Sequence, residues 1–363
     1  MSRFLALALA LGNITDLEFI LLSRAKKRRQ KRAITERFRL KAFSNVDCLD
    51  MFRFAKNDIR RLRTLLRFPL KFRLRNGMLL PTMEVLCLVL ARLSYPCRFK
   101  DLRYLFRRHR TILSNMFNIG VNFIYIQTKS LLTTLNSSYL TAERLEMYAE
   151  ASAAATDDLS EPMNVWAYLD GTTRPICRPI ENQRLVYNGK DRVHALKYQA
   201  VTTLDGIIVH LAGPIEGARH DSHMLRESGL LELLNEKMIT IRKMYRLYGD
   251  AAYSINDVLL TPYRNAKKRK EIRFNEILAQ VRVAVEWSFG KVVQEFAFTD
   301  YRKNQKLLLQ PVAQQYIVSV ALTNMHTCIN QSLCGKTFHV ITPTLEEYLS
   351  DVPEPTARYR VGL

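Results

Sequence analysis

Two acidic side chains stand where apolar runs end. Asp170 follows the run at residues 165–169, and Asp250 closes the shorter run that begins at residue 245. In open α/β sheets, ligand-binding and catalytic groups gather where strands end. Two carboxylates held close together need a cation between them, and hard oxygen ligands favour Mg²⁺ or Mn²⁺. The pattern indicates a divalent-metal site, although Asp170 followed by Gly171 is also a common way to open a turn.

A third acid, Glu286, lies in the run V-R-V-A-V-E-W-S-F-G, which has the period of a helix. Val281, Val285 and Phe289 form an apolar stripe in that run. Arg282 and Glu286 are four residues apart on another face. Taken alone, this pair predicts only a surface ion pair that contributes little to stability.

The elements that must hold these acids follow one another in an α/β order. The sequence predicts strands at 165–169, 195–203, 207–212 and 245–248, and helices at 221–234, 275–296 and 305–328. Asp205-Gly206 between the second and third strands is a strong hairpin signal. This order resembles a ribonuclease H-like architecture, a mixed sheet flanked by helices. In that architecture the strands that carry Asp170 and Asp250 are neighbours, so we expect their carboxylates side by side.

The basic residues are concentrated in one region. The chain of 363 residues has a formal net charge of +21. Residues 24–110 hold 26 Lys and Arg against 6 Asp and Glu, whereas the rest holds 29 against 28. A polyanion, DNA or RNA, is the natural partner of such a region.

Four regions are predicted along the chain. Residues 1–35 form a basic arm, and residues 36–155 form an all-helical region. An acidic, loop-like stretch at 156–162 precedes an α/β domain at 164–330, and residues 331–363 form a tail. In the arm, a dense run of cations predicts nuclear import or phosphate binding, with a solvated arm as the alternative. These cations are Lys26, Lys27, Arg28, Arg29, Lys31 and Arg32.

The helical region contains a pattern similar to a helix-turn-helix unit. Helices predicted at 99–106 and 111–123 flank a short basic join, and the second of them would enter the major groove of DNA. A plain helical bundle with a basic rim explains the same pattern. The candidate DNA-binding residues of the join are Arg107, Arg108 and Arg110.

Cysteine and histidine usage narrows the class of protein. The six cysteines form no C-x-x-C pair, which favours a reduced, intracellular chain without a zinc ribbon. His220 and His223 flank Asp221 and raise the question of zinc, but a lone pair at this spacing is more often structural. No apolar run reaches transmembrane length, so no membrane partner is expected.

Four acidic segments follow one another in the second half of the chain. They read L-D-G-T at Asp170, G-A-R-H-D-S-H at Asp221, Y-G-D-A-A-Y at Asp250 and V-R-V-A-V-E-W-S-F-G at Glu286. Asp250 and Glu286 enclose 35 residues. Over residues 164–324 this series resembles the DDE endonuclease family of Harbinger-type transposases.

The resemblance implies a ribonuclease H-like core with a catalytic triad. Asp170, Asp250 and Glu286 would bind two divalent ions, Mg²⁺ or Mn²⁺, and cleave a phosphodiester by in-line displacement. Asp221 would be an accessory ligand, or it would cap its helix. The family more often has Gly at the position of Ala252 and His at that of Thr173, and neither position carries a metal ligand.

We interpret the sequence as a nuclear, metal-dependent DNA endonuclease or transposase-like protein. The alternatives are a domesticated descendant that binds DNA or a protein without cutting, and a nucleic-acid-binding regulator with an inert fold. In the resembled family, sequence-specific DNA binding can be delegated to a separate Myb-like protein, and a homo-oligomer is a further expectation. A basic run before the 275–296 helix is predicted to hold the DNA backbone, or is simply solvated. It consists of Lys267, Lys268, Arg269 and Lys270.

Overall fold

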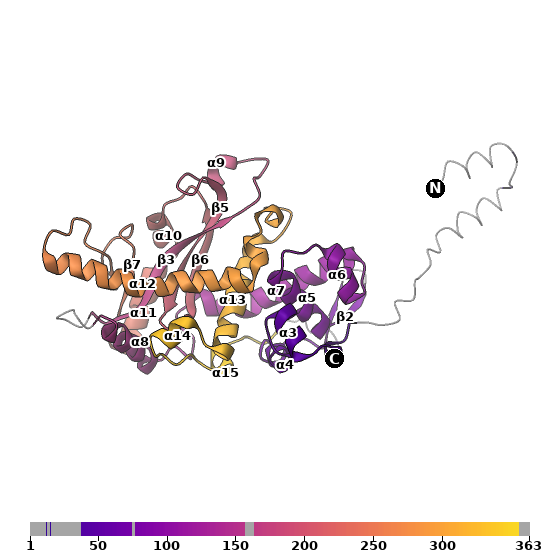
Figure 1. Cartoon of the computed structure of the whole chain (residues 1–363), viewed down its shortest axis with the longest axis horizontal. Coiled ribbons are helices and arrows are strands. Elements are labelled where there is room, and N and C mark those ends of the chain that lie inside the picture. The colour runs from indigo at the N-terminus through magenta and orange to yellow at the C-terminus, as the bar shows by residue number, and fades with distance from the viewer. Residues whose placement is uncertain (1–11, 13–14, 16–37, 75–76, 157–162, 356–363) are drawn as a thin grey trace.

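The computed structural model describes residues 12, 15, 38–74, 77–156 and 163–355, with the side chains of residues 284 and 285 left out. The candidate import run at residues 26–32 therefore lies outside the described residues. Figure 1 shows helices on the N-terminal side of the molecule and a sheet covered by helices on the other.

Within the described residues, six strands form the central sheet. β3 (Val165–Pro175) pairs antiparallel with β5 (Val193–Thr203) and parallel with β7 (Arg246–Gly249). β5 also pairs with β6 (Ile208–Glu216) and with β4 (Tyr187–Asn188), and β7 pairs with β8 (Leu259–Leu260). The predicted α/β class is confirmed as a mixed sheet flanked by helices.

β3 is longer than predicted. The expected strand ended at residue 169, whereas β3 continues through Asp170 to Pro175. Its antiparallel ladder with β5 supplies backbone partners as far as the Pro175–Ala195 pair, beyond the parallel ladder with β7. The apolar run marks only the part of the strand that is buried on both faces.

The predicted hairpin at Asp205-Gly206 is confirmed, and a helix anchors it. The carboxylate of Asp205 is buried and accepts a hydrogen bond from the amide of Ile207 at 3.0 Å. The hydroxyl of Tyr148, on α8 (Ala142–Ala154), donates to the same carboxylate at 2.7 Å. A buried carboxylate needs such partners, which here tie α8 to the end of the sheet.

Long helices cover the sheet. α12 (Arg269–Glu295) crosses it and packs on β3, β5 and β7, as Figure 1 shows in orange. The predicted 275–296 helix thus begins six residues earlier than expected. The predicted 221–234 helix is split into α10 (Asp221–Glu227) and α11 (Leu230–Ile241), because Gly229 between them has a φ of +64°. α13 (Val312–Asn330) begins directly after Pro311.

The N-terminal region is mostly but not wholly helical. β1 (Lys71–Arg73) and β2 (Leu79–Pro81) form a short antiparallel hairpin that the all-helical prediction missed. Strands of three residues are too short for an alternating pattern to be recognised in the sequence. The helices of this region are η1 (Leu40–Ala42), α3 (Asn45–Phe52), α4 (Lys56–Leu65), α5 (Thr82–Ser94), α6 (Phe99–Phe106) and α7 (Arg110–Thr133).

The helices and the sheet share one buried core. α7 packs on α5 and α6 and also contacts β6 and α13. The buried guanidinium of Arg92 on α5 lies 4.7 Å from the ring centroid of Phe99 and 4.1 Å from that of Phe298. Phe298 belongs to η2 (Ala297–Asp300), directly after α12, so this stack joins the two parts.

The remaining elements are short and lie at the edges. They are α9 (Gln183–Val186), η3 (Arg302–Asn304), α14 (Leu333–Thr337) and α15 (Leu345–Tyr348). The buried hydroxyl of Tyr348 accepts a hydrogen bond from Asn324 of α13 at 2.9 Å, which docks the end of the described chain. None of the helices in the described segments is long and apolar enough to cross a membrane.

Candidate active site

The β3–β7 register brings Asp170 and Asp250 next to each other. Leu169 of β3 is paired with Gly249 of β7, the last pair of this parallel ladder. The next residue on each chain is the acid, so both carboxylates lie at the point where β7 leaves the sheet. Asp170 is largely buried, with 18% of its side chain exposed, whereas Asp250 is exposed. The ladder therefore sets one shielded and one solvated acid side by side.

Arg282 joins Asp170 to the acid on the helix. Its Nη1 donates to Oδ2 of Asp170 at 2.6 Å, and its Nη2 lies 3.6 Å from Oε1 of Glu286. The amide of Gly171 donates to the other oxygen of Asp170 at 2.9 Å. The predicted pair of Arg282 and Glu286 is thus confirmed, and it is part of a wider ion cluster.

The charges of the neighbouring groups act on Asp170. Burial raises the pKa of Asp170, and the facing charge of Arg282 and the Gly171 amide offset part of that rise. The negative charges of Asp250 and Glu286 raise the pKa of Asp170 further. All three acids therefore share one electrostatic environment, and Arg282 is the cation that counters it.

Asp221 belongs to the same environment and does not cap its helix. The N-cap position of α10 is His220, and Asp221 is the first residue of the helix. Oδ1 of Asp221 lies 3.1 Å from the ammonium of Lys197 on β5. A Cβ atom at Gly171 would lie 3.3 Å from the carboxyl carbon of Asp221. This acid is thus packed over the backbone of the residue that follows Asp170.

Tyr253 lies beside the end of β7 and is affected by the charges of three of the acids. Its hydroxyl is buried and accepts a hydrogen bond from Gln199 of β5 at 3.0 Å. Burial raises the pKa of Tyr253 well above its usual range, and the charges of Asp221, Asp170 and Asp250 raise it further. Neither Tyr253 nor Lys197 was predicted as part of the site, because each acts through contacts between distant segments.

The oxygen ligands of the four acids suit a hard divalent ion, but Arg282 is paired with two of these acids. Asp170, Asp221, Asp250 and Glu286 offer only oxygen ligands, which Mg²⁺ and Mn²⁺ favour. Across the described residues, no three His, Cys, Asp or Glu side chains are arranged to hold a metal ion. The guanidinium of Arg282 occupies the space between two of the acids. A metal ion held by both Asp170 and Glu286 would have to displace Arg282 from between them.

Histidines and cysteines do not offer a second metal centre within the described residues. His223 lies 3.1 Å from Glu227, one turn along α10. The cysteines, all within the described part of the chain, are free thiols. The zinc reading of the H-D-S-H segment therefore has no support in the structure.

The candidate DNA-binding residues have different surroundings. Arg107 and Arg110 are exposed at the join between α6 and α7. Arg108 instead forms a two-pronged ion pair with the buried Glu84 of α5, at 2.5 and 2.7 Å. Its guanidinium is committed to the helical core. The second basic run is exposed around the start of α12, and it consists of Lys267, Lys268, Arg269 and Lys270.

One family model matches the part of the chain that carries this site. Residues 169–324 match the model of the DDE superfamily endonucleases. The matched segment contains Asp170, Asp221, Asp250 and Glu286. It supports a transposase-like nuclease at the level of the superfamily. No curated protein and no solved structure matches the chain.

Proposed function

We propose that the chain is a Harbinger-type DNA endonuclease that uses two divalent metal ions, Mg²⁺ or Mn²⁺. The observation that carries this proposal is the register of β3 and β7, which makes Asp170 and Asp250 neighbours beside Glu286 on α12. The match to DDE superfamily endonucleases supports the same assignment.

The topology also supports it. The strands follow the order β6, β5, β3, β7, β8, with β5 antiparallel to β3 and with β3, β7 and β8 parallel. A ribonuclease H-like fold has this arrangement, with acids on the first strand, at the end of the fourth strand and on a covering helix. A fold supports a chemistry only together with its site.

Each side chain then has a distinct part in the proposed reaction. Asp170, Asp250 and Glu286 would hold the metal ions, with Asp221 as a further oxygen donor. Bound there, the ions would activate a water or a 3′-hydroxyl and stabilise the leaving oxygen at a phosphodiester. Arg282 would release Asp170 and Glu286, and its freed guanidinium would then face the phosphate backbone.

The basic surfaces supply the substrate class. Exposed cations near the join of α6 and α7 and at the start of α12 favour a polyanion. We therefore propose DNA as the substrate and the nucleus as the location, with a Myb-like protein as the partner that recognises the target sequence. The predicted import run at residues 26–32 fits this assignment.

A second candidate is a descendant that binds DNA without cutting it. The ion pair of Arg282 with Asp170 favours this reading, since a permanent guanidinium in the acidic group would exclude metal. The two candidates differ in one measurable property, which is metal-dependent strand cleavage.

A nicking assay separates them. Supercoiled and element-end DNA would be incubated with the full chain in Mg²⁺ or Mn²⁺, beside Glu286→Gln. Glu276→Gln is the matched control, because Glu276 lies on the same helix and faces Arg273 at 3.7 Å. Cleavage by the wild type and the control but not by Glu286→Gln supports the enzyme. A wild type that cuts nothing in any divalent metal supports the second candidate.

A further inference from the structure

A polar hollow adjoins the acidic group. It has a volume of about 520 Å³, and Glu286 and Trp287 of α12 are among its lining residues. Further lining residues follow at spacings of four along the same helix as far as Glu295, so the hollow runs along one side of α12. Residues 331–334, where α13 gives way to α14, form another wall. Because Glu286 belongs to both the hollow and the acidic group, a ligand in the hollow would lie next to any metal ion that Glu286 holds.

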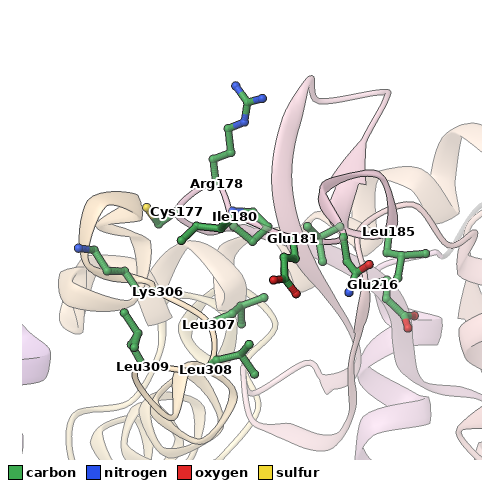
Figure 2. Close-up of a pocket in the computed structure, with 13 residues that line it drawn as sticks. Cys177, Arg178, Ile180, Glu181, Leu185, Glu216, Lys306, Leu307, Leu308 and Leu309 are labelled. Carbon is green, nitrogen blue, oxygen red and sulfur yellow. The ribbon is translucent and has the colours of Figure 1, made fainter.

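A second hollow of the molecule has a different chemistry. Figure 2 shows it, with Leu307, Leu308 and Leu309 below Ile180. Its volume is about 700 Å³, and its walls are mainly apolar. In the polar hollow, amides, hydroxyls and carboxylates form a larger share of the wall, and one of the carboxylates is that of Glu286. The polar hollow is therefore the one whose lining bears on the candidate site.

Gly290 keeps the polar hollow open. It lines the hollow, and a Cβ atom at this position would meet nothing within 4 Å. Glycine weakens a helix relative to alanine, and no close packing requires a glycine here. On another wall, Gln331 has a φ of +55°, a left-handed value that residues other than glycine seldom adopt. Such unfavourable local features gather where a protein holds a ligand.

The charges of the polar hollow argue against a bound phosphate. Its lining carries two carboxylates, Glu286 and Glu295, and one ammonium, Lys291. The ammonium donates a hydrogen bond to the hydroxyl of Thr327 at 2.8 Å. Burial, and to a smaller extent the charges of neighbouring cations, lowers the pKa of His326 to about 4, so this ring is neutral near pH 7. An uncharged ligand is therefore favoured over an anion.

The side chains of the polar hollow suit a nucleobase. The indole of Trp287 is 37% exposed, and an exposed aromatic ring is a stacking surface for any base. Gln294 and Gln331 are exposed lining residues. Their carboxamides can both donate and accept hydrogen bonds at the edge of a base. A nucleobase is planar and uncharged, and the proposed DNA substrate supplies it.

We infer that the polar hollow binds one unpaired nucleobase of the DNA strand whose phosphate lies at the acidic group. The base would stack on Trp287 and meet the carboxamides with its edge, while its phosphate stays beside Glu286. A paired base must first leave its stack, which costs least where the DNA is already unpaired. The inference rests on DNA as the substrate in the proposed function, but not on metal binding or on cleavage.

Photo-crosslinking of the full chain in a chelator tests where the base lies. One DNA hairpin would carry 5-iodouracil at a single unpaired position, and a second hairpin would carry it in a base pair. The unpaired probe should cross-link to Trp287, as peptide mass spectrometry would show, and Trp287→Leu should abolish this product. Tyr301→Leu is the control, since Tyr301 is 39% exposed and lies outside the hollow. A cross-link that persists at equal yield in Trp287→Leu would overturn the inference.

Affinities give a second, independent test. Fluorescence anisotropy in the chelator measures the dissociation constants of DNA with one unpaired nucleotide and of its fully paired counterpart. The wild type should prefer the unpaired nucleotide by about 10-fold or more, because stacking of one base on an aromatic ring has an effect of this size. Gly290→Leu fills the hollow and Trp287→Leu removes the stack, so each should bring the ratio of the two constants close to one. Gly290→Ala adds only a methyl group and should keep most of the preference.

The ratio separates binding in the hollow from a loss of structure, because unfolding weakens the binding of both DNAs alike. A wild type without preference would overturn the inference, and so would an unchanged ratio in Gly290→Leu. A full chain that binds no DNA would overturn both the inference and the proposed function. A chain that cross-links through Trp287 but cuts nothing in any divalent metal would support the inference and overturn only the proposed cleavage.

Discussion

Arg282 of α12 donates a 2.6 Å hydrogen bond to Asp170 of β3, across 112 residues of sequence. The guanidinium thereby provides the positive charge that the neighbouring acids need. Both side chains are mostly shielded, with 25% of Arg282 and 18% of Asp170 exposed. Two segments that a sequence shows far apart are thus joined at the centre of the candidate site.

Replacing Arg282 with Gln should destabilise the metal-free protein. The variant leaves Asp170 shielded and without its cation, and we expect a loss of about 1–3 kcal/mol in the free energy of unfolding. Urea denaturation in a chelator measures this loss. Arg282→Lys keeps the charge and should lose less. Equal stability of the Gln variant and the wild type would show that the ion pair contributes nothing.

Replacing Asp250 with Asn should remove metal-dependent cleavage. The amide keeps the shape of the side chain but loses the charge that would balance a divalent ion. DNA binding in a chelator should stay unchanged, because the exposed cations lie elsewhere. Stability in the chelator should rise slightly, because Asp250 and Asp170 repel each other. Cleavage at the wild-type rate would refute a catalytic role for Asp250.

Neutralising the basic run at the start of α12 should weaken DNA binding. The variant replaces Lys267, Lys268, Arg269 and Lys270 with Gln. If all four contact phosphates, the slope of log affinity against log salt should become shallower by about 3–4. Fluorescence anisotropy over a salt series measures that slope. Lys243→Gln is the control, since Lys243 already lies 2.7 Å from Glu146. An unchanged slope in the variant with all four substitutions would show that these residues do not contact DNA phosphates.

Two glycines within helices should respond in opposite directions to alanine. At Gly120 of α7, a Cβ atom would lie 2.6 Å from a methyl group of Val89 on α5. Gly120→Ala should therefore cost about 1–3 kcal/mol of stability, and Val89→Ala in the same chain should recover part of it. At Gly290 of α12, a Cβ atom would meet nothing within 4 Å, so Gly290→Ala should stabilise by up to about 1 kcal/mol. Thermal denaturation of both variants decides the matter.

His210 should make the protein less stable in mild acid. Burial in β6 lowers the pKa of His210 from 6.5 to about 4, and no group of the described residues forms a hydrogen bond with its Nδ1. Between these two values the unfolded chain binds the proton and the folded chain does not, so stability falls as pH drops. The loss attributable to His210 is at most about 3 kcal/mol. His210→Leu should flatten the decline of stability from pH about 6.5 to about 4, the two pKa values that set the window. His339→Asn, at an exposed histidine, should not.

Part of the candidate site could be predicted from the sequence, because the signals for that part lie in neighbouring residues of the chain. Asp170 and Asp250 each close an apolar run, and Asp205-Gly206 is a turn signal that needs no distant partner. The reach of Arg282 to Asp170, and the place of Tyr253 among the acids, depend on how α12 and β7 pack on the sheet. The spacing of apolar residues along the chain gives no information about such contacts between distant segments. The helix-cap alternative for Asp221 came from the local chain, because caps are set locally, whereas its ion-pair partner, Lys197, lies on the strand β5.

α7 has a mechanical consequence for the molecule. It is one uninterrupted helix of 24 residues, about 36 Å long, that starts beside Arg107 and packs against β6 and α13. Because α7 packs both on the N-terminal helices and on β6 and α13, it restricts the movement of these two parts relative to each other. A displacement of its first turn, beside Arg107, would therefore also move the sheet at β6. A polymer bound at that end would be held at a fixed angle to the acidic group.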